Sequence, residues 1–523
     1  MHLNSKYLGS LSVLSLLIFT IPMLNSISYT LGSIFLLFIS LVSYVLIAKM
    51  NKNYASLGAL FALVFLSTVA LSNLKLMDYQ REWSMLTWFV IFIGFFLFEL
   101  IYELSIKFDT KKIENYLIKD KQKYISNKQM FIICAVMFFL SILGYIITAL
   151  QCGFIPFFVT DNINAYSEFY TKFLLLSHLC IINIPLSAYL FYKEDSRSIK
   201  IILIIYIFIQ TFVLPILAVN RGIFLIGAIT LSCTLFYLYN QRLSILIICL
   251  TLSFIGYEIG SIGRHYSNEL LSTSFNQASV ETNETTENSD TLPSDNLIQE
   301  EANASDNNLE NEKLPTNDVD ANQEKINPSI TTTKIPSSNE TIELMGTNTF
   351  VVNYNGEKLS DLNIQIPQRM LFLYSYLTVS HDNFDLAVKY SDQNTFGLRC
   401  LSGFDFLLKR IWPGYDNNFD FYQVQFNLNT VNILGTPYYD LKIVGIIIYI
   451  SLLAFICRII ESLYLKTKNI FSLLLLAQMF YCITLSFFSN YTSQFIFVCS
   501  LVSIFSLFIL YHILHMIRGV SEK

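Results

Sequence analysis

Charged residues are scarce in this chain, and so are the short motifs that mark common soluble enzymes. Asp, Glu, Lys and Arg make up 14% of the 523 residues, whereas 53% are hydrophobic. A soluble globular domain typically carries about 25% charged residues, so the composition excludes a soluble globule and favours a polytopic membrane protein. The sequence also contains no GxxxxGK(S/T), GxGxxG, HExxH or GxSxG motif. Nucleotide binding is therefore not indicated, and we expect no cofactor.

Cysteines with metal-binding spacing are missing as well. Seven of the nine cysteines fall within apolar stretches, where they act as small hydrophobic residues. Cys152 and Cys400 fall in predicted loops, which leaves a disulfide between them open. Because no CxxC or His/Cys ligand pattern occurs, we expect no bound metal.

Long apolar runs dominate what is present. A bilayer requires roughly 20 apolar residues per helix. Twelve stretches meet or approach this length: 8–24, 29–48, 55–74, 85–101, 130–150, 173–192, 201–219, 222–239, 243–262, 441–460, 470–488 and 495–514. We therefore expect an all-α polytopic membrane protein with about 12 transmembrane helices. The first stretch lacks a cleavage site and is followed at once by the second, so we interpret it as a signal anchor.

The loops between these spans differ in charge. One alternating set contains fifteen Lys and Arg residues, whereas the other contains four, namely Lys75, Arg81, Lys172 and Arg221. By the positive-inside rule, both termini are cytoplasmic and the large loop is external. The expected organisation is nine spans in 1–262, an external loop in 263–440, three spans in 441–514 and a cytoplasmic tail in 515–523, in the plasma membrane.

An acidic insert occupies 273–346 of the external loop. It holds fifteen Asp and Glu residues against three Lys and almost no aromatic residues, so we expect it to be disordered. Outside the insert the chain is basic, but its basic residues flank the spans and form no continuous patch, so no nucleic-acid partner is expected. In 347–440 we expect ordered structure, with a hairpin at Asn355-Gly356 and interfacial helices at 369–379 and 396–411.

Outward-facing cations are the strongest functional signal, because they run against the positive-inside trend. Arg221 occupies a turn of two or three residues between the seventh and eighth spans, and Arg264 follows the ninth. A guanidinium group matches the oxygens of a pyrophosphate. Ordinary contact with lipid headgroups is the alternative, and it is the interpretation we adopt for Lys409 and Arg410.

Other polar residues carry weaker signals. His381 lies beside Asp382, and either residue is a candidate general base, although a hydrogen-bonded surface residue is the alternative. Glu99, Glu103 and Arg458 lie near the inner ends of predicted spans, where we expect their side chains to reach the membrane interface.

Four segments resemble Wzy-type O-antigen polymerases, which join oligosaccharide repeat units. They are GFIPFFVTDNINAY, AVNRGIFLIGAIT, YLTVSHDNFDLAVKY and NTVNILGTPYYDLKIVG. The resemblance covers most of residues 130–500 in order, with the external loop in the expected place. Two departures are the acidic insert and Asp440-Leu441-Lys442, which stands where the family often has Asp-Phe-Gly.

The resemblance implies a GT-C-like, metal-independent glycosyltransferase that acts on polyprenyl-pyrophosphate-linked oligosaccharides at the outer face of the membrane. It implies Arg221 as the pyrophosphate clamp, supported by Arg264 and Arg369, with His381 or Asp382 accepting the hydroxyl proton. Further substrate contacts are expected from Arg369, Lys389, Arg399 and Asp440. The implied partners are the lipid-linked oligosaccharide, membrane lipids, and the flippase and chain-length regulator of the same pathway.

Three alternatives remain open. An O-antigen ligase shares the donor and leaving group but uses another acceptor. A transferase using polyprenyl-phosphate sugars requires acidic residues in the first external loop, which here is Asn25-Ser26-Ile27-Ser28. A flippase or another transporter also has about a dozen spans, but it does not require a long external loop.

Overall fold

A computed structural model describes residues 5–105, 127–159, 168–169, 171–240, 242, 244, 251, 339–345, 348–362, 367–412, 414–415, 419–425 and 428–521. These residues belong to one compact unit, which comprises Met1–His265 and Pro336–Lys523. Arg264 and almost all of the predicted acidic insert lie outside the described residues.

The first half of this unit is helical. Its elements are α1 (Ser5–Leu16), η1 (Leu17–Thr20), α2 (Ile21–Asn25), α3 (Tyr29–Asn51), α4 (Leu57–Asn73), α5 (Met85–Leu104), α7 (Asn127–Cys152), η3 (Pro156–Phe158), α9 (Leu174–Ser177), α10 (Cys180–Lys193), α11 (Arg197–Phe208), η4 (Ile209–Val213), α12 (Leu214–Leu217) and α13 (Arg221–Leu238). Several of these helices begin at a side-chain cap. For example, Ser56 accepts a hydrogen bond from the backbone N–H of Ala59, and Ser84 accepts one from Thr87.

The second half adds a small sheet to further helices. Its elements are β1 (Glu340–Met345), β2 (Thr349–Tyr354), α15 (Gln368–Tyr390), η5 (Ser402–Phe404), α16 (Asp405–Ile411), β3 (Phe421–Gln423), α17 (Gly435–Thr467), α18 (Ile470–Thr484), η6 (Tyr491–Ser493) and α19 (Phe495–Ser521). β2 pairs antiparallel with β1 and parallel with β3.

The prediction of a helical polytopic membrane protein is confirmed in its coarse form. Eight helices among the described residues are long and apolar enough to cross a membrane: Tyr29–Asn51, Met85–Leu104, Asn127–Cys152, Leu174–Lys193, Arg197–Leu217, Arg221–Leu238, Gly435–Thr467 and Phe495–Ile513. Shorter apolar helices cover Gly9–Asn25, Leu57–Asn73 and Ile470–Thr484. The predicted span 243–262 falls almost entirely outside the described residues.

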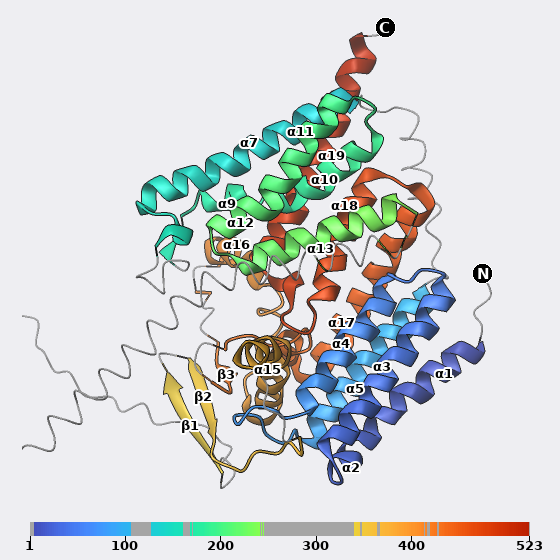
Figure 1. The fold of residues 1–523 in the computed structure, drawn as a ribbon, viewed down its shortest axis with the longest axis vertical. Helices are drawn as coiled ribbons and strands as arrows, with labels where there is room; N and C mark the ends of the chain where they lie inside the picture. Colours follow the sequence, from blue (N-terminus) through green and yellow to red (C-terminus); the bar gives the residue numbers. More distant parts are fainter. Residues whose placement is uncertain are drawn as a thin grey trace, which may run out of the picture. The chain divides into compact units, whose positions relative to one another are not determined.

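The spans pack in two groups that α17 and α18 connect (Figure 1). α3 packs on α4 in the group drawn in blue, where α17, drawn in orange, packs on α5. α10 packs on α13 in the group drawn in cyan and green, and α18 contacts both α13 and α4. Outward faces remain apolar, with Ile34, Phe38 and Leu41 of α3 more than half exposed. Such a face suits contact with lipid acyl chains.

The structure corrects three expectations for the loop and answers the question left open for its cysteines. Asn355-Gly356 does not form the hairpin turn. In the β1–β2 ladder Glu340 pairs with Tyr354 at one end and Met345 pairs with Thr349 at the other, so the connection between the strands lies between Met345 and Thr349. β1 itself lies within the stretch expected to be disordered. The expected interfacial helix at 369–379 is the first half of α15, whose second half is buried. Cys152 and Cys400 are both free, so the open disulfide is not formed.

The second expected interfacial helix is shorter than the apolar run suggested. Residues 396–411 form turns, then η5 and the seven-residue α16. Its apolar side chains are exposed, including Phe406 at 58% and Ile411 at 71%. This exposure beside Lys409 and Arg410 fits the headgroup contact expected from the sequence.

Candidate functional site

The turn between α12 and α13 places Arg221 at the N-terminus of a long helix. Arg221 is the first residue of α13, and the side chain of Asn220 caps the helix by accepting a hydrogen bond from Ile223 N at 3.0 Å. The first turn of α13 contains no acidic residue. The N-terminus of a helix carries a partial positive charge and exposes backbone N–H groups, so this end of α13 favours an anion.

The chain leading into this turn departs from regular helix. The π-helical segment η4 precedes α12, and Val219 has a φ of +50°. Left-handed backbone is unusual for a β-branched residue and costs of order 1–3 kcal/mol. Both π-helical turns and strained backbone are frequent at functional sites. The backbone conformation therefore indicates the α12–α13 turn as a candidate site, as the charge of Arg221 does.

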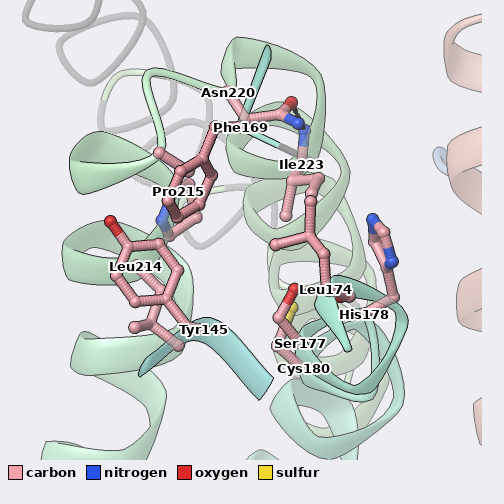
Figure 2. Close-up of a pocket in the computed structure, with 11 residues that line it drawn as sticks. Tyr145, Phe169, Leu174, Ser177, His178, Cys180, Leu214, Pro215, Asn220 and Ile223 are labelled. Carbon is pink, nitrogen blue, oxygen red and sulfur yellow. Dashed lines mark hydrogen bonds between the residues drawn. The ribbon is translucent and has the colours of Figure 1, made fainter. Parts of the chain in front are cut away.

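A cavity of about 230 Å³ opens beside this helix end. Figure 2 shows that its walls come from several helices of the cyan and green group. They are mostly apolar, with polar groups contributed by Tyr145, Ser177, His178 and Asn220; the other lining residues are Phe169, Leu174, Cys180, Leu214, Pro215, Ala218 and Ile223. An apolar chamber with a few polar groups at a cationic helix end suits an amphiphile with an anionic head.

A second cluster surrounds α15 and consists of a buried ion pair. Lys75 Nζ lies 2.9 Å from Asp382 Oδ1, and the two side chains are 1% and 0% exposed. Asp382 also accepts hydrogen bonds from Trp83 Nε1 at 2.9 Å, Gln80 Nε2 at 2.8 Å and Ser72 Oγ at 3.1 Å. Burial lowers the pKa of Lys75, and the carboxylate of Asp382 opposes this effect. The segment between α4 and α5 is thereby fixed to α15.

The same cluster continues to the sheet. Arg81 pairs with Glu340 at 2.9 Å and donates a hydrogen bond to the backbone carbonyl of Val352 at 2.7 Å. Lys389 pairs with the other oxygen of Glu340 at 2.7 Å, and Tyr390 donates a hydrogen bond to it. These contacts attach β1 and β2 to both α15 and the α4–α5 connection. Lys389, which we expected to bind substrate, therefore has a carboxylate partner within the protein.

His381 is an interior residue. Its Nε2 lies 3.0 Å from Thr68 Oγ1, and its Nδ1 lies 2.9 Å from Asn432 Nδ2. Its side chain is enclosed, with 1% of its surface exposed. Burial lowers the pKa of His381 to about 3, so the imidazole is neutral near pH 7. The surface location that we considered for His381 is wrong, although its hydrogen bonding is as expected.

Asp385 follows one turn later on α15. Its Oδ1 accepts hydrogen bonds from Ser84 N at 2.9 Å and Thr87 Oγ1 at 2.5 Å. Burial raises the pKa of Asp385. This carboxyl joins the start of α5 to α15, as Asp382 does for the preceding segment.

Arg399 and Asp440 lie in a third cluster. Asp440 accepts hydrogen bonds from the backbone N–H groups of Arg399 at 3.0 Å and Cys400 at 2.9 Å, and from Thr395 Oγ1. The guanidinium of Arg399 stacks 3.8 Å from the centre of the Tyr439 ring and donates a hydrogen bond to Asp420 O. Burial lowers the pKa of Arg399. Asp440 thus orders the chain just before α17 breaks at Leu441 and Lys442.

The structure brings together only some of the predicted site residues. His381, Asp382 and Lys389 share α15, whereas Arg221 begins α13. α13 packs mainly on α10 and α18, and α15 mainly on α4 and β3. Arg369 lies in the first turn of α15, and its side chain is outside the described structure. Sequence reasoning counted Lys75 and Arg81 among the outward-facing cations but gave them no role; the departure from the positive-inside trend that singled out Arg221 applied to them equally.

No known protein family, curated protein or solved structure matches this chain. The function is therefore argued from its residues and their arrangement.

Proposed function

We propose that this protein polymerises polyprenyl-pyrophosphate-linked oligosaccharides at the outer face of the plasma membrane. In this proposal it is a GT-C-like enzyme with about 12 spans, cytoplasmic termini and an external 263–440 segment. The eight long apolar helices and the ordered segment between α13 and α17 support such an organisation. The four segments that resemble Wzy-type polymerases supply the reaction class.

The cavity beside α13 is the observation on which the proposal depends. Transfer of the growing chain breaks the bond between its anomeric carbon and the lipid pyrophosphate, so negative charge develops on the departing pyrophosphate. The N-terminus of α13 supplies positive charge beside the cavity, because Asn220 and Ile223 line it; Arg221 is not itself a lining residue but adds a cationic side chain to the same first turn. The apolar walls suit the adjoining part of the isoprenoid chain. This arrangement stabilises the leaving group without requiring a metal ion.

The α15 cluster serves the acceptor side in this proposal. Asp382 already accepts four hydrogen bonds, and His381 is enclosed. Their contribution in the described conformation is to hold α15 in place. For Asp382 to receive a proton from an acceptor hydroxyl, the hydroxyl would have to replace one of these donors.

Variants of Arg221 test the proposal in cells. Removing one group that stabilises developing negative charge typically lowers kcat by about 10²–10³-fold. We therefore expect Arg221→Ala to abolish surface polysaccharide ladders and to leave single lipid-linked units at the outer face. Arg221→Lys keeps the charge but loses the planar fork, so an intermediate loss is expected. The matched control is Lys172→Ala, which removes an exposed cation shortly before α9.

The alternatives give different products. A ligase variant would accumulate completed polymer on its lipid carrier, and a transporter variant would accumulate single units at the inner face. Ladders of normal intensity in Arg221→Ala would refute the assignment of the clamp.

A further inference from the structure

Two glutamates near the end of α5 are enclosed within the helical bundle. Glu99 is 2% exposed and Glu103 is 0% exposed. Both were expected to extend toward the membrane interface, and that expectation is wrong. Since each turn of an α-helix contains 3.6 residues, positions 99 and 103 lie on one face of α5.

At this end of the bundle, a neighbouring carboxylate has hydrogen-bond donors for both of its oxygens. Glu461 of α17 accepts hydrogen bonds from Asn53 Nδ2 at 2.7 Å, Leu57 N at 3.2 Å, Tyr102 OH, and Tyr237 OH at 3.4 Å. Each oxygen of Glu461 therefore has a donor, one of them the backbone N–H at the N-terminus of α4; the single hydroxyl proton of Tyr237 is shared with Ala55 O at 3.1 Å.

Glu99 and Glu103 differ sharply from Glu461. Neither oxygen of Glu99 receives a hydrogen bond from any described residue. Glu103 Oε1 accepts one from Asn51 Nδ2 at 2.8 Å, but within the same described residues its Oε2 has no donor. A buried ionised carboxylate without donors is strongly unfavourable and acquires a proton instead.

Among the described residues, the neighbouring charged side chains donate no hydrogen bond to these oxygens. Arg458 of α17 lies with its guanidinium 5.0 Å from the centre of the Tyr102 ring and donates a hydrogen bond to Tyr102 OH at 3.4 Å. This guanidinium donates no hydrogen bond to either oxygen of Glu99 or to Glu103 Oε2. Lys49 and Lys52, at the end of α3, are exposed to solvent.

α4 packs closely against the side of Glu99 that faces Gly58. A Cβ atom added at Gly58 would lie 2.7 Å from the Tyr102 ring and 3.2 Å from Glu99 Oε2. A hydrated cation does not fit in contacts this close, whereas a proton needs no added volume. The geometry therefore selects a proton as the species that satisfies these oxygens.

We propose that Glu99 and Glu103 form a proton-binding site between α4, α5 and α17. Glu99 carries the proton, and Glu103 links it through the partly buried Asn51 to solvent at this end of the bundle. Tyr237, which contacts Glu461, lies near the end of α13, whereas Arg221 begins that helix. The proton-binding site is therefore separate from the cavity and does not depend on the proposed polymerase activity.

Infrared spectroscopy of the full-length protein in lipid nanodiscs tests this site. A protonated carboxyl shows a C=O stretching band that an ionised one lacks. The wild-type-minus-Glu99→Gln difference spectrum at neutral pH should contain this band, which should shift in D₂O. The band should move in frequency in Glu103→Gln, because its neighbour has changed. The matched control, Glu343→Gln, alters an exposed strand residue and should leave the carboxylic acid C=O band unchanged.

Protein stability provides a second readout. Gln has the shape and neutrality of a protonated Glu, so Glu99→Gln should unfold at the same temperature as the wild-type protein. A difference spectrum without the carboxylic acid band would overturn the proposal. Failure of Glu99→Gln to fold, while Glu343→Gln folds normally, would also overturn it, because that result requires an ionised Glu99.

Discussion

Replacing Asp382 with Asn tests the buried ion pair that attaches α15 to the rest of the bundle. The change leaves the Lys75 ammonium 1% exposed without its counter-ion. It also places an amide nitrogen among donors that now point at a carboxylate, namely Trp83 Nε1, Gln80 Nε2 and Ser72 Oγ. Of these three neighbours, Trp83 Nε1 and Gln80 Nε2 can only donate, so Ser72 Oγ alone can accept a hydrogen bond from that amide.

The expected cost follows from burial. Removing one partner of a buried ion pair typically destabilises a protein by about 3–5 kcal/mol, because the other charge stays uncompensated. The free energy of unfolding of a protein is typically about 5–15 kcal/mol, so Asp382→Asn should remove a large fraction of it. Asp78→Asn is the matched control: it alters an exposed carboxylate in the same α4–α5 connection and should change stability by less than about 0.5 kcal/mol.

Unfolding of the purified protein by urea in detergent micelles, followed by tryptophan fluorescence, provides the measurement. Trp83 contacts Asp382 directly, and its ring centre lies 5.1 Å from that of Trp88, so the signal reports on the cluster itself. Combining Asp382→Asn with Lys75→Gln completes a double-mutant cycle, in which the double variant should lose less than the sum of the single variants. Additive losses, or an Asp382→Asn variant as stable as Asp78→Asn, would refute the reasoning.

Two further predictions concern His381 and Asn220. Because the folded pKa of His381 is about 3, below its unfolded value near 6.5, the unfolded state binds more protons between these values, and stability should fall by up to about 1.4 kcal/mol per pH unit as pH decreases through this window. The raised pKa of Asp385 acts in the opposite direction, so the effect is measured as the difference in pH dependence between wild-type protein and His381→Gln; parallel curves would contradict it. Asn220→Ala should destabilise the protein by about 1 kcal/mol in the same urea assay, because Ile223 N loses its cap, and an unchanged midpoint would show that the cap is dispensable.

Hydrophobicity predicted the membrane spans because each span is a continuous run of apolar residues within one short stretch of the sequence. Each of the eight long apolar helices overlaps a predicted stretch, since a run of apolar residues needs no distant partner to indicate a membrane helix. α15 was recognised only in its first half. Its second half carries His381, Asp382 and Asp385, and these residues are buried because partners from α4 and the α4–α5 connection reach them. No local pattern contains that information.

The hairpin error has a similar origin. Asn355-Gly356 is the strongest short turn signal in its region, yet the pairing of Glu340 with Tyr354 ends the ladder just before it. Glu340 belongs to an acidic, polar stretch that by composition resembles a disordered segment. Its ion pairs with Arg81 and Lys389 explain why this glutamate lies in an ordered strand.

The distance along the chain between Lys75 and Asp382 has a consequence for biogenesis. The two residues are 307 positions apart. At typical synthesis rates of 5–20 residues per second, the ribosome produces Asp382 about 15–60 s after Lys75. During that interval the ammonium group has no carboxylate from α15, so the nascent α4–α5 hairpin must keep this connection hydrated. A chain stopped before residue 382 would retain an unmatched cation at Lys75.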